Sequence, residues 1–82
     1  MEFPSESPEL VPALVVALKD KDFGVRVAVC EALGNHGPAA RAAVPGLIRL
    51  LKDENAPKQA AADALRKIDP DAAAKAGVRI RE

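Results

Sequence analysis

The chain has 82 residues, 49% of them hydrophobic, and its 12 basic residues balance 12 acidic ones. This length allows one domain, and a formal charge of zero gives no general attraction to nucleic acid or to an anionic membrane surface. The single Cys excludes an internal disulfide framework and fits a reducing cytoplasm, where we expect the protein to lie. Trp and Tyr are absent and the two Phe lie outside the second helix of each predicted unit, so base-stacking platforms are missing. No apolar run approaches the roughly 18 residues of a membrane span. We therefore expect neither nucleic-acid nor membrane partners.

Residues 1–7 show no periodicity and are expected to form a flexible N-terminus. The first helix should begin at Ser7-Pro8-Glu9, with Ser as the N-cap, Pro at the first helical position and Glu at the positive end of the helix dipole. It should run to about Lys19. Its apolar residues recur with helical spacing and predict one buried stripe: Val11, Leu14, Val15 and Leu18.

The turn over residues 20–24 leads into a second helix, for which Asp22 is the expected N-cap. This helix should end between Gly34 and Gly37. Its predicted inward residues are Val25, Ala28, Val29, Ala32 and Leu33.

Pro38 opens a linker, expected to contain a short helical turn, and a third helix should end near Asp53. Its stripe is Val44, Leu47, Ile48 and Leu51. A fourth helix, capped by Asn55, should run from about Ala56 to Lys67. Its expected inward residues are Ala60, Ala61, Ala64, Leu65 and Ile68. A short helix closed by Gly77 should follow Pro70.

The chain contains an internal repeat. VPALVVALKD begins at Val11 and VPGLIRLLKD begins at Val44, 33 residues later. Downstream, Leu33 and Leu65 align at a spacing of 32. The predicted organisation is therefore a single domain with one unit over 8–37, a second over 38–69, and a truncated third unit or cap over 70–82.

These units resemble HEAT repeats of the short bacterial type, similar to the bilin-lyase HEAT-like family. The resemblance rests on VPALVVALKD, the following turn with Asp20 and Asp22, and VRVAVCEALG with its Arg26. It implies an all-α protein: an α-α superhelix, or HEAT-like solenoid, of two helical hairpins plus a short C-terminal capping helix. Solenoids normally need three units for stability, so we expect self-association or a longer parent array. The outward-facing Val16 favours association.

The resemblance also implies a structural ladder of charged pairs that joins the units. In it Arg26 reaches the aspartates of the preceding turn, Asp20 or Asp22. In the second unit Asp53 and Lys58 occupy the matching positions. Lys58 lacks the planar fork of an arginine, which weakens the expectation for that pair.

The same resemblance places the second helix of each unit on the partner-binding surface. Glu31 and Asp63 are equivalent positions there, with Gln59, Arg66 and Lys67 beside them. An acidic row of this kind would meet basic groups of a partner protein. The alternative interpretation is an ordinary solvated helix surface.

No set of residues in the sequence predicts a catalytic, metal-binding or cofactor-binding site. Nothing in the sequence is predicted to activate Cys30 as a nucleophile. His36, the only histidine, occupies an apolar position of the repeat. We expect no catalytic residue, no metal site and no cofactor. The predicted function is a non-catalytic protein-protein interaction or assembly scaffold. The alternative is a subunit or fragment of a HEAT-like bilin lyase or isomerase, in which the helices would cradle a tetrapyrrole.

Overall fold

The computed structural model describes residues 10–78, which are helical throughout apart from short turns and contain no strand. The predicted N-cap Ser7 and the segment 1–7 lie outside this range. In chain order the helices are α1 (Leu10–Ala17), α2 (Phe23–His36), η2 (Gly37–Ala43), α3 (Val44–Lys52), α4 (Lys58–Ile68) and α5 (Pro70–Lys75). The 3₁₀ helix η2 is the helical turn expected after Pro38. The all-α prediction is confirmed.

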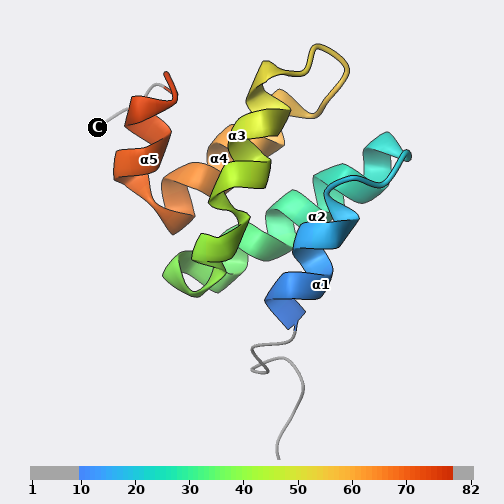
Figure 1. Ribbon diagram of the computed structural model, residues 1–82, viewed down its shortest axis with the longest axis horizontal. Helices are drawn as coiled ribbons and strands as arrows, with labels where there is room; N and C mark the ends of the chain where they lie inside the picture. The colour runs from blue at the N-terminus through green and yellow to red at the C-terminus, as the bar shows by residue number, and fades with distance from the viewer. Residues whose placement is uncertain (1–9, 79–82) are drawn as a thin grey trace, which may run out of the picture.

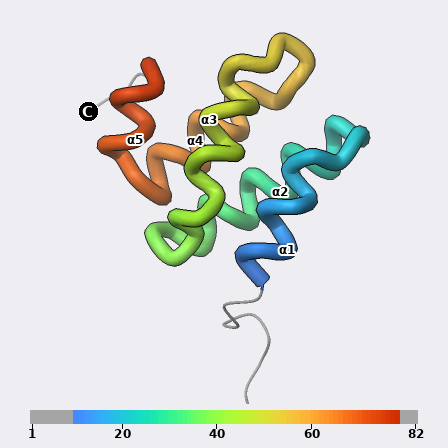
Figure 2. The backbone as a smooth tube through the Cα atoms, in the orientation of Figure 1, coloured from blue at the N-terminus to red at the C-terminus, as the bar shows by residue number. Residues whose placement is uncertain are grey.

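The helices form two hairpins that stack side by side (Figure 1). The first consists of α1 and α2 and the second of α3 and α4, with η2 leading from one to the other. The principal packing between the hairpins joins α2 to α4, and α5 then packs against α4 (Figure 2). The resulting body measures 41 × 30 × 18 Å. Within residues 10–78, no helix has the length and apolar character required to cross a membrane.

The core lies where the two hairpins meet. Its largest fully buried side chains are Leu33, Leu47, Leu65 and Cys30. Leu33 and Leu65 are equivalent positions of the repeat and have the same burial. Leu14 and Leu47 are also equivalent, but Leu14 is only half-buried, and within residues 10–78 no helix precedes α1.

The inward stripe predicted for α4 is confirmed, with Ala61, Ala64, Leu65 and Ile68 buried. The stripe predicted for α2 is wrong at two positions, since Val25 is 38% exposed and Ala28 is also exposed. The residues of α2 that are buried are Val29, Cys30, Leu33 and Gly34. Val25 and Ala28 lie on the side of α2 that faces away from the second hairpin.

The predicted N-cap of the second helix is correct in the first hairpin and wrong in the second. Asp22 caps α2 as predicted, because its Oδ1 accepts hydrogen bonds from the N–H groups of Gly24 at 2.8 Å and Val25 at 3.3 Å. Asn55 does not cap α4, which begins only at Lys58 and has Pro57 at the capping position. The reason is a local turn: the Asn55 N–H donates to Asp53 Oδ1 at 2.9 Å, which directs the chain away from a helical start.

Gly77 closes α5 as predicted. Its φ of 93° lies in the left-handed region that favours glycine. The N–H groups of Gly77 and Val78 donate to the carbonyls of Ala74 and Ala73 at 3.1 and 2.9 Å, the pair of bonds that defines a Schellman motif. At the other end of α5, Asp69 accepts from the Ala72 N–H at 3.1 Å. Both ends of this six-residue helix are therefore fixed.

Candidate functional site

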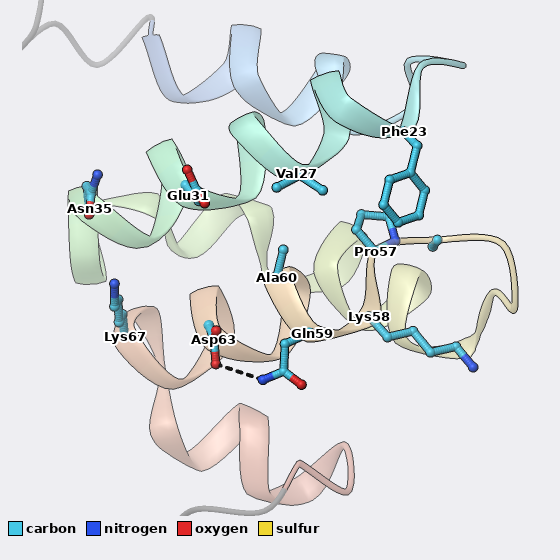
Figure 3. A pocket seen from close by; sticks show the side chains of 11 residues that line it. Phe23, Val27, Glu31, Asn35, Pro57, Lys58, Gln59, Ala60, Asp63 and Lys67 are labelled. Atoms are coloured by element: carbon cyan, nitrogen blue, oxygen red, sulfur yellow. Dashed lines mark hydrogen bonds between the residues drawn. The ribbon is translucent and has the colours of Figure 1, made fainter.

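A groove of about 700 Å³ runs between α2 and α4 on one face of the molecule (Figure 3). The α2 wall is a stripe with residues every four positions, which places them on a single side of the helix. The opposite wall comes from the start and the outer face of α4. The lining residues are Phe23, Val27, Glu31 and Asn35 from α2, and Ala56, Pro57, Lys58, Gln59, Ala60, Asp63 and Lys67 from the second hairpin.

The groove changes character along its length (Figure 3). One end is apolar, because Phe23, Val27 and Pro57 lie together there. Phe23 is 51% exposed although it is a large aromatic residue. The other end carries the polar side chains of Asn35 and Lys67.

The two carboxylates of the groove differ in their interactions. Asp63 forms an ion pair with Arg66 and also accepts a hydrogen bond from Gln59 Nε2 at 3.4 Å. Glu31 is exposed and has no ion-pair or hydrogen-bond partner among residues 10–78. Its negative charge is consequently available to a ligand, whereas the charge of Asp63 is largely balanced.

The structure brings together four of the five residues predicted for partner binding. Glu31, Gln59, Asp63 and Lys67 all line the groove. Arg66 lies on the other side of Asp63 and borders a second hollow, near Gly77 and Val78. Lys58 and Lys67 balance the two carboxylates, so the groove is not the purely acidic row that we expected.

Sequence reasoning missed Phe23, Val27 and Asn35. The predicted turn over residues 20–24 included Phe23, but Phe23 is the first residue of α2. The signal that could have found all three is their spacing, since they stand four or eight residues from Glu31. Once Glu31 is placed on a surface, the same helix face must include them.

The structure does not form the expected ladder of charged pairs. Arg26 Nη2 donates to the backbone carbonyl of Asn55 at 3.2 Å, and the guanidinium lies 5.7 Å from the centre of the Phe23 ring. Asp20 and Asp22 are occupied in their own turn, where Asp20 Oδ1 accepts from the Asp22 N–H at 2.8 Å. Arg26 still joins the two units, but through a carbonyl of the second turn. No ion pair joins Asp53 to Lys58 among the described side chains.

Cys30 and His36 lie apart from the groove. Cys30 is 0% exposed, and burial raises the pKa of its thiol to about 11, so the thiol stays protonated at neutral pH. Nearby Arg26 opposes this rise only in part. His36 is half-buried at the last residue of α2. Within the described part of the chain, no group of three or more His, Cys, Asp or Glu side chains is placed to hold a metal ion.

Two stacked helical hairpins with an inter-hairpin groove define an α-helical repeat protein. The family model for HEAT repeats matches residues 4–66, more than half of the sequence, and the chain therefore belongs to the HEAT repeat family. HEAT repeats generally mediate protein-protein interaction or scaffolding. No curated protein and no solved structure matched the chain.

Proposed function

We propose that the protein is a non-catalytic binding module that holds a segment of a partner protein in the groove between α2 and α4. The observation that carries the proposal is the placement of an exposed aromatic residue, Phe23, and an unpaired carboxylate, Glu31, on one wall of that groove. Aromatic residues, Phe among them, are enriched in the buried core of protein interfaces relative to the rest of the protein surface.

The groove favours a ligand with two features. An apolar side chain fits the end formed by Phe23, Val27 and Pro57, where burial of each Å² of apolar surface contributes about 25 cal/mol. A basic side chain fits the middle, where Glu31 is unpaired. Lys58 and Lys67 stand towards the two ends of the groove and disfavour a ligand that is basic along its whole length (Figure 3). We therefore propose a short segment with one apolar anchor and one central Arg or Lys.

The groove gives the tetrapyrrole alternative no support. A bilin-binding cavity should be lined by a Cys, Tyr or Trp. The chain has no Tyr or Trp, and its one Cys is buried in the core, away from the groove. The groove residues also give no nucleophile activated by a neighbouring base, so we retain a non-catalytic role.

A peptide library displayed on phage tests the proposal. Selection on the full chain should enrich peptides in which an apolar residue is followed or preceded at short distance by Arg or Lys. Calorimetric titration of an enriched peptide should show affinity at least tenfold weaker, about 1.4 kcal/mol, for Glu31→Lys and for Phe23→Ala.

The matched control is Glu54→Lys, which reverses an exposed glutamate in the turn between α3 and α4, outside the groove. This variant should bind the peptide as the wild type does, and circular dichroism should show equal helicity for all variants. Enrichment of acidic peptides, or equal affinity of the Glu31→Lys variant, would show that the proposed ligand is wrong.

A further inference from the structure

A separate pocket of about 470 Å³ lies between the C-terminal parts of the first helices of the two hairpins. Its apolar residues are Val15 and Leu18 from the first hairpin and Gly46 and Leu50 from the second. The hairpins approach closely here, since a Cβ added to Gly46 would lie 3.0 Å from Leu18 Cδ1. Leu18 and Leu50 are buried, so the floor of the pocket is apolar. A pocket of this size, with apolar walls and a few charged groups, is typical of small-molecule sites.

The charges around this pocket are unbalanced. Among residues 10–78, four basic side chains border it and Asp53 is the one acidic residue that does so. The basic residues are Lys19, Arg26, Arg49 and Lys52. This lining, which we call the basic pocket, therefore carries a formal charge of 4 − 1 = +3 in a chain whose net charge is zero. Charges of one sign around a hollow with apolar walls concentrate the electrostatic field inside it.

The described part of the protein does not neutralise these cations. The side chains of Lys19, Arg49 and Lys52 form no ion pair or hydrogen bond with residues 10–78. Asp53 Oδ1 accepts from the Asn55 N–H at 2.9 Å, which holds this carboxylate in its own turn. The Arg26 guanidinium donates through Nη2, while its buried Nε has no hydrogen-bond partner among the described residues. The pocket consequently keeps a positive charge that an anionic ligand would balance.

Helix stability does not explain the whole set. Lys19, Arg49 and Lys52 lie at or just beyond the C-terminal ends of α1 and α3, where the helix dipole favours a basic residue. Arg26, however, lies in the first turn of α2, where the dipole disfavours a cation. The repeat does not require a cation at position 49 either, because the equivalent residue of the first unit is Val16. Cations from both hairpins therefore converge on one pocket.

We propose that the basic pocket binds a small phosphate monoester that carries a short apolar group. The phosphate of a monoester has a charge of about −1.5 to −2 at neutral pH, which matches the excess of +3 better than a single carboxylate does. Arg26 and Arg49 offer N–H groups in the planar arrangement that fits phosphate oxygens, and a lysine binds phosphate as a point charge. The apolar group lies on Leu18 and Leu50, where it is removed from water.

The basic pocket is distinct from the groove between α2 and α4. The two share no lining residue within the described range. Their charge requirements are also opposite, because the groove offers an unpaired carboxylate at Glu31 and the basic pocket offers cations. This inference therefore goes beyond the function proposed above and does not depend on it.

Titration of the full chain with hexyl phosphate, followed by two-dimensional NMR of the amide groups, tests the proposal. Hexyl phosphate should cause saturable shifts at Leu18, Gly46 and Leu50 and leave Glu31 in the groove unshifted. Three comparison ligands separate the features of the ligand. Inorganic phosphate lacks the apolar group and hexanol lacks the charge, so each should bind roughly tenfold more weakly. Hexanoate carries a single negative charge and should bind several-fold more weakly.

Arg49→Glu should weaken the binding of hexyl phosphate roughly tenfold or more, because it replaces an attracting charge with a repelling one. Arg49 is exposed on α3, so circular dichroism should show unchanged helicity. Arg41→Glu is the matched control, because it makes the same charge change at an exposed residue of η2 outside the pocket. This variant should bind hexyl phosphate as the wild type does.

Three results would overturn the proposal. The first is a lack of saturable shifts up to the concentration at which hexyl phosphate forms micelles. The second is binding of inorganic phosphate, hexanol or hexanoate as tight as that of hexyl phosphate. The third is equal affinity of the wild type and the Arg49→Glu variant. None of these results bears on the groove, whose ligand is tested with the Glu31→Lys and Phe23→Ala variants.

Discussion

At the scale of single residues, aspartates organise the turns between paired helices. Asp20 Oδ1 accepts from the Asp22 N–H at 2.8 Å, and Asp53 Oδ1 accepts from the Asn55 N–H at 2.9 Å. Asp20 and Asp53 are equivalent positions of the repeat, so the same side-chain turn occurs in both hairpins. Such a turn gives the N–H groups of Asp22 and Asn55, which lie in the connection after each helix, a side-chain acceptor.

Asp22 provides the clearest test at this scale. Asp22→Ala removes the acceptor for two N–H groups at the start of α2 and should lower the free energy of unfolding by about 1 kcal/mol. Asp22→Asn keeps an oxygen in the same place and should leave it nearly unchanged, since Asn is an equally good cap. Urea unfolding followed by circular dichroism measures both values. An equal loss in the two variants would mean that the charge of Asp22, and hence an ion pair such as the expected one to Arg26, provides the stability.

The different outcomes for Asp22 and Arg26 have a physical cause. Capping is local, because the acceptor and the N–H groups lie within three residues of each other, and the sequence was sufficient to predict it. The partner of Arg26 lies 29 residues away, at the Asn55 carbonyl. That carbonyl is positioned by the turn before Pro57, whose path the sequence did not predict. The partner of Arg26 was therefore harder to predict than the cap at Asp22, and the failed cap at Asn55 has the same cause, the unpredicted path of this turn.

At the scale of helices, the close approach of α2 and α4 depends on small residues. Gly34 is buried in the last turn of α2, against the backbone and side chain of Ala64. A backbone atom cannot move aside as the tip of a flexible side chain can. Glycine usually weakens a helix by roughly 1 kcal/mol relative to alanine, so its presence here reflects packing.

Gly34→Val should lower the free energy of unfolding by roughly 2 kcal/mol, because the added methyl groups force α2 away from α4. The control is Asn35→Val, which introduces the same side chain at the next, exposed position of α2 and should cost less than about 0.5 kcal/mol. Urea unfolding gives both values. If both variants lost a similar amount of unfolding free energy, the space between α2 and α4 would not be what requires glycine at position 34.

The helix stripes show what periodicity can predict. It predicted the buried residues of α4 and failed for Val25 and Ala28 of α2. These two positions correspond to Pro57 and Ala60, which pack against the preceding hairpin. A residue that faces a neighbouring repeat has the same apolar character as one that faces the core. Only the presence of a neighbour decides whether it is buried, and the helical period carries no information about that.

At the scale of the molecule, the internal repeat predicted more of the site than any individual residue did. Equivalence of Glu31 and Asp63 placed both on the same surface, and they do lie across one groove. The apolar end of the groove was not predicted, because it needs the start of α2 and the start of α4 to meet. That meeting depends on how the hairpins stack. The repeat predicts which helix faces of the two hairpins are equivalent. The groove depends in addition on the distance between the hairpins, which the repeat does not predict.

The central claim is that the two hairpins form one body through direct contact of α2 with α4. A Cβ at Gly34 would lie 3.6 Å from Ala64 Cβ, within the range of about 3.5–4.5 Å that a disulfide requires. The decisive measurement is therefore oxidation of the variant Gly34→Cys with Ala64→Cys, made with Cys30→Ala, followed by intact-mass spectrometry.

We predict that oxidation of the folded variant removes both thiol hydrogens within one molecule. The oxidised variant should keep the helicity of the wild type, because a disulfide typically contributes about 2–4 kcal/mol and offsets the crowding that a Cβ at position 34 introduces. Gly34→Cys combined with Ala74→Cys is the control, because Ala74 lies on the exposed face of α5 and should form no internal bond. Free thiols at positions 34 and 64 in a protein that remains helical would contradict the stacked arrangement on which the groove depends.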